Sequence, residues 1–229
     1  MVTVAYEYDI PSCYPRILLD VLKLKLPQLE IVYDNKQLRS QFIGWLFRSR
    51  PDLKVLVQET TKTIIETYLK QVDNDDVVLV KNDGFIVTKP IYDTKAGLLP
   101  VVLRHKFSIF VFDDETKTYV GLDSLKDKAI LKGVRDKTVG IETWWTKVLQ
   151  SLDNSIIQNL IIEYFTTDDM SLFAIMTNDP SKYIFRLENG SIYESSVLQV
   201  PSLQVDRRYY FGIHVKPLLR QLVMSLQEW

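Results

Sequence analysis

The sequence predicts an α+β fold, with a largely antiparallel sheet and several helices in residues 1–137 and a mainly helical part in residues 138–229. Three observations predict this fold. Short segments before residue 138 alternate apolar and polar residues, as strands do. Leucine and isoleucine recur at helical spacing between those segments. After Thr138 the helical spacing dominates, which places a domain boundary near that residue.

The N-terminal segment is predicted to form one strand followed by three helices. VTVAYEYDI alternates, and Pro11 and Pro15 then bracket a turn, after which RILLDVLKLKL carries leucines at helical spacing. Asp34 or Asn35 can cap a second helix, which must end before Pro51 because proline disfavours a helical residue before it. LKVLVQETTKTIIETYLKQ is predicted to be the third helix.

A hairpin and further strands are predicted next. VVLVK and FIVTKPI flank the tight turn NDG, so Asp83 lies at the tip of a β-hairpin. VVLRHKFSIFVF, TKTYVGL and AILKGV are further strand segments. After Thr138, two helices, a short β portion and a final amphipathic helix from about Tyr209 complete the chain.

Composition excludes several classes of protein. An apolar fraction of 46% and a charged fraction of 25% are typical of a folded chain rather than a disordered one. No apolar run is long enough to span a membrane, and Glu7 and Asp9 stand where a signal peptide needs basic and apolar residues. We therefore expect a soluble, intracellular, cytoplasmic protein that is not secreted and does not bind a membrane.

Cysteine and histidine are too few for a disulfide framework or a zinc cage. Cys13 is the single cysteine, and His105 and His214 are the only histidines. A bound metal must then be held by carboxylates, which favours Mg²⁺ or Mn²⁺.

The net charge of −1 argues against a uniformly basic nucleic-acid-binding surface. Local basic segments remain candidates for such binding, at Arg104–Lys106 and Lys126–Lys137. Either one alone is more typical of a solvated strand edge.

Two acids are predicted to meet at one end of the sheet. Asp9 ends the first strand and Asp83 lies at the hairpin tip, so neighbouring antiparallel strands would place their carboxylates side by side. Two carboxylates on rigid strands suit a two-metal phosphoryl-transfer site, in which the ions lie about 3.5–4 Å apart. Each acid taken alone is more typical of a turn that needs local hydrogen bonds.

The order of several motifs resembles family B DNA polymerases. DIPSCYPRI is similar to the first palm motif of that family, Asp-x-x-Ser-x-Tyr-Pro, which Asp9, Ser12, Tyr14 and Pro15 match. This first motif is one of the two individually specific matches.

Two further segments resemble the next motifs of the family. KQLRSQFIG matches the ends of Lys-x-x-x-Asn-Ser-x-Tyr-Gly at Lys36 and Gly44, with Ser40 in place of the asparagine. VVLVKNDGFIV resembles the Asp-Thr-Asp-Ser hairpin, with Asp83 on the second acid and Lys81 on the first.

Three later segments follow in the family's order. Lys117 and Tyr119 match the Lys-x-Tyr motif at the edge of the palm, and LKGVR, with Lys132 and Arg135, resembles the strand that follows it. DRRYYFGIHVKPLLRQL is similar to the last thumb helix.

The resemblance implies a palm in residues 1–137 with much reduced fingers, whose helices lie at about 14–72, and a thumb in residues 138–229. It implies a DNA-directed DNA polymerase subunit or fragment, which transfers a nucleotide from a dNTP to the primer 3′-hydroxyl of a primer-template DNA. We expect this chain to act without an exonuclease domain of its own, which the family normally carries. A second polypeptide is expected to supply it in a split polymerase; the alternative is a minimal, viral-type enzyme.

The resemblance also implies residue roles. Asp9 and Asp83 would be catalytic and hold two Mg²⁺ or Mn²⁺ ions, with the Ile10 carbonyl as a further ligand. Tyr14 would exclude a ribose 2′-hydroxyl, and Lys36 would offset phosphate charge. The nucleotide-binding residues would be Ser12, Cys13, Tyr14, Lys36 and Ser40, and the DNA-binding residues Gly44, Lys117, Tyr119, Lys132 and Arg135.

Two alternatives stay open. A degenerate palm and thumb would bind DNA or a replication protein without catalysis, which the weak net charge and the cation Lys81 beside the expected metals favour. An unrelated α+β interaction domain would require every resemblance to be accidental.

Overall fold

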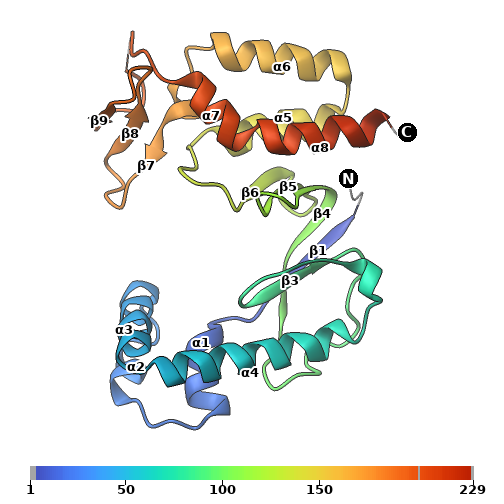
Figure 1. Ribbon diagram of the computed structural model, residues 1–229, viewed down its shortest axis with the longest axis vertical. Coiled ribbons are helices and arrows are strands. Elements are labelled where there is room, and N and C mark those ends of the chain that lie inside the picture. The colour runs from blue at the N-terminus through green and yellow to red at the C-terminus, as the bar shows by residue number, and fades with distance from the viewer. Residues whose placement is uncertain (1–3, 201, 228–229) are drawn as a thin grey trace. The chain divides into compact units, whose positions relative to one another are not determined.

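The computed structural model describes residues 4–200 and 202–227, and within them the fold is α+β (Figure 1). The described strands form a six-stranded sheet in the order β2-β3-β1-β4-β5-β6 and a three-stranded sheet in the order β7-β8-β9. The pairs β1–β3, β2–β3, β4–β5 and β5–β6 are antiparallel, as the sequence predicts for the main sheet.

The described chain divides into two units. The first comprises Ala5–Lys106, and the second holds Val4 and the described residues from Phe107 onward. The boundary predicted near residue 138 marks the change from strands to helices inside the second unit.

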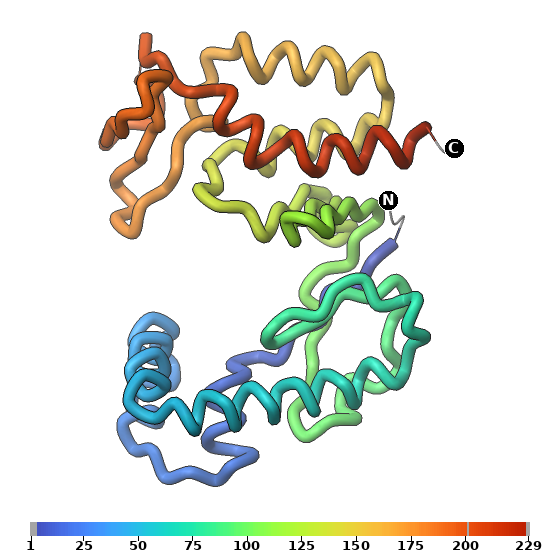
Figure 2. The backbone as a smooth tube through the Cα atoms, in the orientation of Figure 1, coloured from blue at the N-terminus to red at the C-terminus, as the bar shows by residue number. Residues whose placement is uncertain are grey.

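The first unit carries one strand, a run of helices and a hairpin, which Figure 2 follows from the blue N-terminal end of the tube. Its elements are β1 (Ala5–Asp9), α1 (Cys13–Arg16), the π-helix η1 (Ile17–Val21), α2 (Pro27–Ile31), α3 (Lys36–Ser49), α4 (Pro51–Leu69), the 3₁₀-helix η2 (Asn74–Asp76), β2 (Val77–Val80), β3 (Gly84–Val87) and the first part of β4 (Val102–Asp113).

Local signals explain where α3 and α4 begin. The side chain of Asn35 accepts hydrogen bonds from the amides of Gln37 and Leu38, both at 3.1 Å, and so caps α3. Pro51 occupies the first turn of α4, where its missing N–H leaves no helical bond unmade.

The first predicted helix is shorter than its leucine pattern indicates. It begins at Cys13, turns π-helical at Ile17 and ends at Val21, and Lys23 then adopts a left-handed φ of 55°. A left-handed residue cannot continue a right-handed helix, so the chain runs irregularly until the short α2.

The core of the first unit lies between the long helix α4 and the strands. Ile64, Ile65 and Tyr68 of α4 are buried together with Phe85 of β3. The hydroxyl of Tyr68 donates to the carbonyl of Leu99 at 2.7 Å, which satisfies its polar end inside the core. This packing supports the hairpin from the side of α4.

The second unit combines strands, two long helices, the small sheet and a C-terminal helix pair. Its elements after β4 are β5 (Thr118–Asp123), β6 (Lys128–Lys132), α5 (Ile141–Ser151), α6 (Asn154–Thr166), the 3₁₀-helix η3 (Met170–Phe173), β7 (Ile175–Met176), β8 (Tyr183–Arg186), β9 (Ile192–Ser195), α7 (Arg207–His214) and α8 (Lys216–Gln227).

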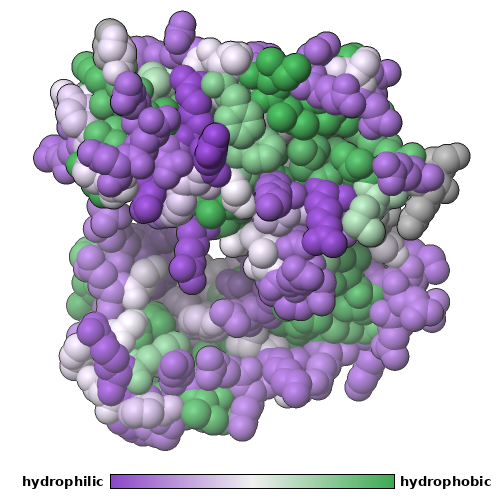
Figure 3. Space-filling view, turned by 45° about the horizontal axis from the view of Figure 1, so that its top comes forward, coloured by the Kyte–Doolittle hydropathy of each residue, from purple (hydrophilic) through white to green (hydrophobic). Residues whose placement is uncertain are grey.

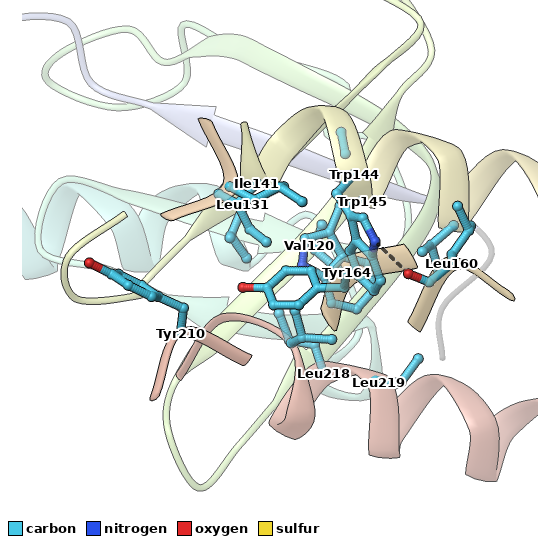
Figure 4. Packing of buried hydrophobic residues seen from close by; sticks show 14 of the residues in the cluster. Val120, Leu131, Ile141, Trp144, Trp145, Leu160, Tyr164, Tyr210, Leu218 and Leu219 are labelled. Atoms are coloured by element: carbon cyan, nitrogen blue, oxygen red, sulfur yellow. Dashed lines mark hydrogen bonds between the residues drawn. The ribbon is translucent and has the colours of Figure 1, made fainter. Parts of the chain in front are cut away.

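Aromatic side chains fill the core of this unit. Figure 4 shows Trp144 and Trp145 of α5 packed with Tyr164 and with aliphatic residues of β5, β6 and α8. The Trp145 indole donates to the carbonyl of His214 at 3.1 Å, so the core also fixes the end of α7.

The final helix predicted from about Tyr209 is two helices. It breaks at Val215, between α7 and α8. Pro217 follows in the first turn of α8, and because it has no N–H to donate to the preceding turn, a new helix begins there.

Both hydrophilic and hydrophobic residues reach the face seen in Figure 3.

Within residues 4–200 and 202–227, no helix combines the length and apolar character needed to cross a membrane.

Candidate functional site

A cavity of about 610 Å³ lies in the first unit, at the C-terminal end of β1. Its walls come from the segment after β1, from α3, from the β2–β3 turn and from the start of β4. It brings together residues that the sequence resemblance takes from three separate motifs, namely Asp9, Ile10, Ser12, Cys13, Tyr14, Lys36, Ser40, Gly44 and Asp83.

The two acids occupy neighbouring positions of the sheet. β1 pairs with β3 so that Asp9 is opposite Gly84, and the amide of Ile10 donates to the carbonyl of Asp83 at 2.8 Å. The predicted adjacency of these two segments is therefore confirmed, and Asp9 and Asp83 both line the cavity.

Gly84 allows this close approach. A Cβ at position 84 would lie 2.3 Å from the carbonyl oxygen of Tyr8 and 3.3 Å from Oδ1 of Asp9. Only glycine fits against the Tyr8 carbonyl at that distance. The short distance to Oδ1 shows that the Asp9 carboxylate lies beside Gly84, which directly follows Asp83.

The negative charge of Asp9 and Asp83 contributes to raised pKa values in the residues that follow β1. The pKa of the Cys13 thiol is raised to about 11, mainly by burial; the hydrogen bond with Thr61 lowers it, and the carboxylates of Asp83 and Asp9 raise it. Burial also raises the pKa of Tyr14, and the charge of Asp83 adds to that effect. Any ligand at this end of the cavity therefore meets an anionic wall.

Three cationic side chains line the same cavity. Lys36 begins α3, and Arg39 lies one turn further along that helix, where it donates to the carbonyl of Tyr33. Arg104, on β4, donates from Nε to Oδ2 of Asp9 at 3.2 Å. The cavity thus carries acids at the strand ends and cations on α3 and β4, an arrangement suited to an anionic ligand that binds through a cation.

Arg39 and Arg104 are site residues that the sequence interpretation missed. The signal for Arg39 was available, because residues three apart on a helix share a face and Lys36 was already singled out. Arg104 was noted only within a basic segment. Its contact with Asp9 depends on the order in which strands that are far apart in the sequence pair in the sheet. No local sequence pattern contains that order.

Lys81 contacts an acid that the sequence interpretation does not single out. The sequence predicts a positive charge beside Asp9 and Asp83, and the ammonium of Lys81 contacts the buried carboxylate of Glu7, two residues before Asp9 on β1. Lys81 also lines a second cavity of about 340 Å³, and Tyr14 forms a wall of both cavities.

Tyr14 and its neighbours form the apolar side of the site. The ring of Tyr14 is half-buried, with its centroid 5.8 Å from that of Phe47 on α3. Gly44 also lines the cavity, and a Cβ there would meet nothing within 4 Å, so the backbone of α3 is open to a ligand at that point.

The residues expected to bind DNA beyond Gly44 belong to the second unit. Tyr119 is 2% exposed and its ring packs against Phe107 and Phe110, which supports a packing role for its side chain. Lys117 contacts Asp114 at an exposed turn. Lys132 is half-buried and Arg135 is exposed.

The donor atoms suit a hard divalent cation that arrives with a phosphate. Within the described residues, no group of three or more His, Cys, Asp or Glu side chains gathers to hold a metal. Mg²⁺ commonly takes only one or two carboxylates from the protein and completes its shell with water and substrate phosphates. Asp9 and Asp83 line the cavity with such a pair of carboxylates, and Ile10 lines it beside them.

No protein-family model matches this chain, and no curated protein matches it either.

Proposed function

We propose that this chain is the palm and thumb of a family B-type DNA polymerase, a catalytic subunit or fragment that extends a DNA primer. The observation that carries the proposal is the single cavity that gathers Asp9, Asp83 and Lys36. Each belongs to a different motif of the resemblance, and nothing in an unrelated α+β domain requires them to share one cavity.

The reaction joins a dNTP to the primer. The 3′-hydroxyl oxygen forms a bond to the α-phosphorus, the bond from that phosphorus to the bridging oxygen breaks, pyrophosphate leaves with the electron pair, and the hydroxyl proton passes to water. Asp9, Asp83 and the Ile10 carbonyl would hold two Mg²⁺ or Mn²⁺ ions, which would supply Lewis-acid activation and charge neutralisation.

The chain's own residues orient the nucleotide. Lys36 and Arg39 face the cavity from α3 and offset the negative charge of the triphosphate. Tyr14 forms the wall against which the sugar lies, and its ring leaves no room for a 2′-hydroxyl. Ser12, with a left-handed φ of 50°, turns the chain after β1, and Ser12, Cys13 and Tyr14 all line the cavity.

A second function is a palm and thumb that binds DNA or a replication protein without catalysis. The ion pair between Arg104 and Asp9 favours it, because this contact occupies an acid that catalysis needs. The net charge of −1 favours a protein partner over bare DNA.

Primer extension distinguishes the two functions. The full chain, with and without a polypeptide that carries the N-terminal and exonuclease parts, is assayed with Mg²⁺, a primer-template and dNTPs. We expect Asp9→Asn and Asp83→Asn to lose extension by orders of magnitude while primer-template binding, followed by fluorescence anisotropy, is kept. Asp52→Asn, an exposed acid at the start of α4, is the matched control. Equal extension by the acid variants and the parent, or none by the parent with its partner, supports the binding function instead.

A further inference from the structure

Arg104 and Asp9 form a weak, exposed ion pair inside the candidate site. Within the described residues, Nε of Arg104 makes one contact with Oδ2 of Asp9, at 3.2 Å, rather than the two-nitrogen fork that arginine and carboxylate can form. The two side chains are 48% and 30% exposed. Exposed pairs of this kind contribute little to stability, so a competing ligand can separate them at small cost.

A divalent cation at Asp9 would compete directly with this guanidinium. Both need the same carboxylate, and the like charges of the ion and of Arg104 repel each other. Arginine stays protonated at any pH a protein tolerates, so a displaced Arg104 must find another anion or return to water.

The cavity suggests which anion that is. Arg104 lines it from β4, while Lys36 and Arg39 line it from α3, so cations border the space from two elements. A triphosphate between them would present oxygens to the planar guanidinium fork, which matches phosphate as well as it matches carboxylate.

We propose that Arg104 exchanges partners: it is the counter-ion of Asp9 in the free protein, and it binds the phosphate tail of the nucleotide once a divalent cation occupies Asp9. This inference rests on the proposed function, since it takes the nucleotide and the cation from there. It adds a binding residue that the motifs do not contain, and it explains how a cation can lie beside a catalytic acid without blocking it.

If Arg104 exchanges partners, its removal should change the affinities for Mn²⁺ and for triphosphate in opposite directions. An Arg104 that only neutralises Asp9 would not produce both changes. Arg104→Gln in the full chain removes the charge and keeps hydrogen-bonding capacity. Without nucleotide, we expect it to bind Mn²⁺ more tightly by up to about fivefold, the factor an exposed ion pair is worth. With Mn²⁺ present, we expect inorganic triphosphate to bind about tenfold more weakly, as for the loss of one charge-assisted hydrogen bond.

Mn²⁺ binding is measured from the electron paramagnetic resonance signal of the free ion, and triphosphate binding by calorimetry. Lys54→Gln, an exposed lysine of α4 outside the cavity, is the charge-matched control and should change neither affinity. Arg104→Lys should keep the parent's Mn²⁺ affinity and show an intermediate triphosphate affinity, because it keeps the charge without the fork. Thermal unfolding confirms that each variant is folded.

The outcomes separate this inference from the polymerase proposal. Unchanged or weaker Mn²⁺ binding by Arg104→Gln, or unchanged triphosphate binding, overturns the exchange even if the parent extends primers. A parent that binds neither probe overturns it too. Opposite changes in a chain that never extends primers support the exchange and count against only the catalytic proposal.

Discussion

The ammonium of Lys81 contacts the carboxylate of Glu7, whose side chain is 5% exposed. Glu7 lies two residues before Asp9 on β1, so the two acids project to the same face of the strand. Lys81 therefore offsets a buried negative charge on that face.

This contact changes what a substitution at position 81 should do. The family resemblance has an acid there, but Lys81→Asp would place a second carboxylate against buried Glu7. We expect it to lower the free energy of unfolding by about 2–4 kcal/mol, because it replaces the attraction between Lys81 and a largely buried carboxylate with repulsion between two carboxylates. Urea denaturation measures the loss.

A double substitution provides the control for the Lys81 prediction. Glu7→Gln with Lys81→Gln removes both charges and should recover most of the stability lost in Lys81→Gln alone. If Lys81→Asp unfolds at the same urea concentration as the parent, the contact contributes nothing.

Substitution of Tyr14 should relax sugar selection. Tyr14→Ala opens the wall where the sugar is proposed to lie, so we expect ribonucleotide incorporation relative to deoxyribonucleotide to rise about tenfold or more, a factor worth about 1.4 kcal/mol. Single-nucleotide extension measures the ratio. Tyr14→Phe should keep discrimination, and Tyr92→Ala, at an 89% exposed site in the same unit, is the control. An unchanged ratio in Tyr14→Ala means that the ring only packs against Phe47.

Cys13 should resist alkylation in the folded chain. With its pKa raised to about 11 by burial and by the carboxylates of Asp83 and Asp9, only about one thiol in a thousand is ionised at pH 8. Mass spectrometry after iodoacetamide treatment should show slow labelling of the native chain and rapid labelling in urea. The chain has one cysteine, so the signal has a single source. Equal rates in both states would place the thiol at the surface.

His214 should make the second unit less stable in mild acid. The side chain is fully buried and Nε2 donates to the carbonyl of Arg135 at 2.9 Å, and burial lowers the pKa of His214 below its ordinary value. The unfolded chain therefore binds the proton more readily, so stability is full above about pH 6.5 and is lost as pH falls below it.

Urea unfolding at pH 7.5 and pH 5.5 measures this loss. His214→Gln should abolish most of the difference between the two pH values, since no imidazole remains to be protonated. His105→Gln, at a half-buried position of β4, should retain the difference. A pH dependence that survives in His214→Gln assigns it to other groups.

Local chemistry predicted more of the fold than of the site. The Asn35 cap and the NDG hairpin each depend on a few neighbouring residues, and each is where the sequence predicts it, while α4 begins at Pro51, two residues before the predicted start of that helix. The adjacency of Asp9 and Asp83 followed from alternation and strand order.

Particular side-chain contacts between distant segments escaped prediction. Lys81 lies 74 residues from Glu7, and Arg104 lies 95 residues from Asp9. Which cation meets which acid depends on strand order and on side-chain reach, and no periodicity in the sequence encodes either. The break between α7 and α8 was missed for another reason, because the apolar spacing continues through it.

The close approach of the main chain at Gly84 to the main chain of β1 sets the spacing between Asp9 and Asp83. Because the Tyr8 carbonyl would lie 2.3 Å from any Cβ at position 84, every other amino acid must push β1 and β3 apart and move Asp9 with them. In a library of all single substitutions selected for function, position 84 should therefore tolerate as few replacements as the acids themselves, although glycine carries no chemistry. A residue without a side chain would then appear in such a selection as if it were part of the active centre.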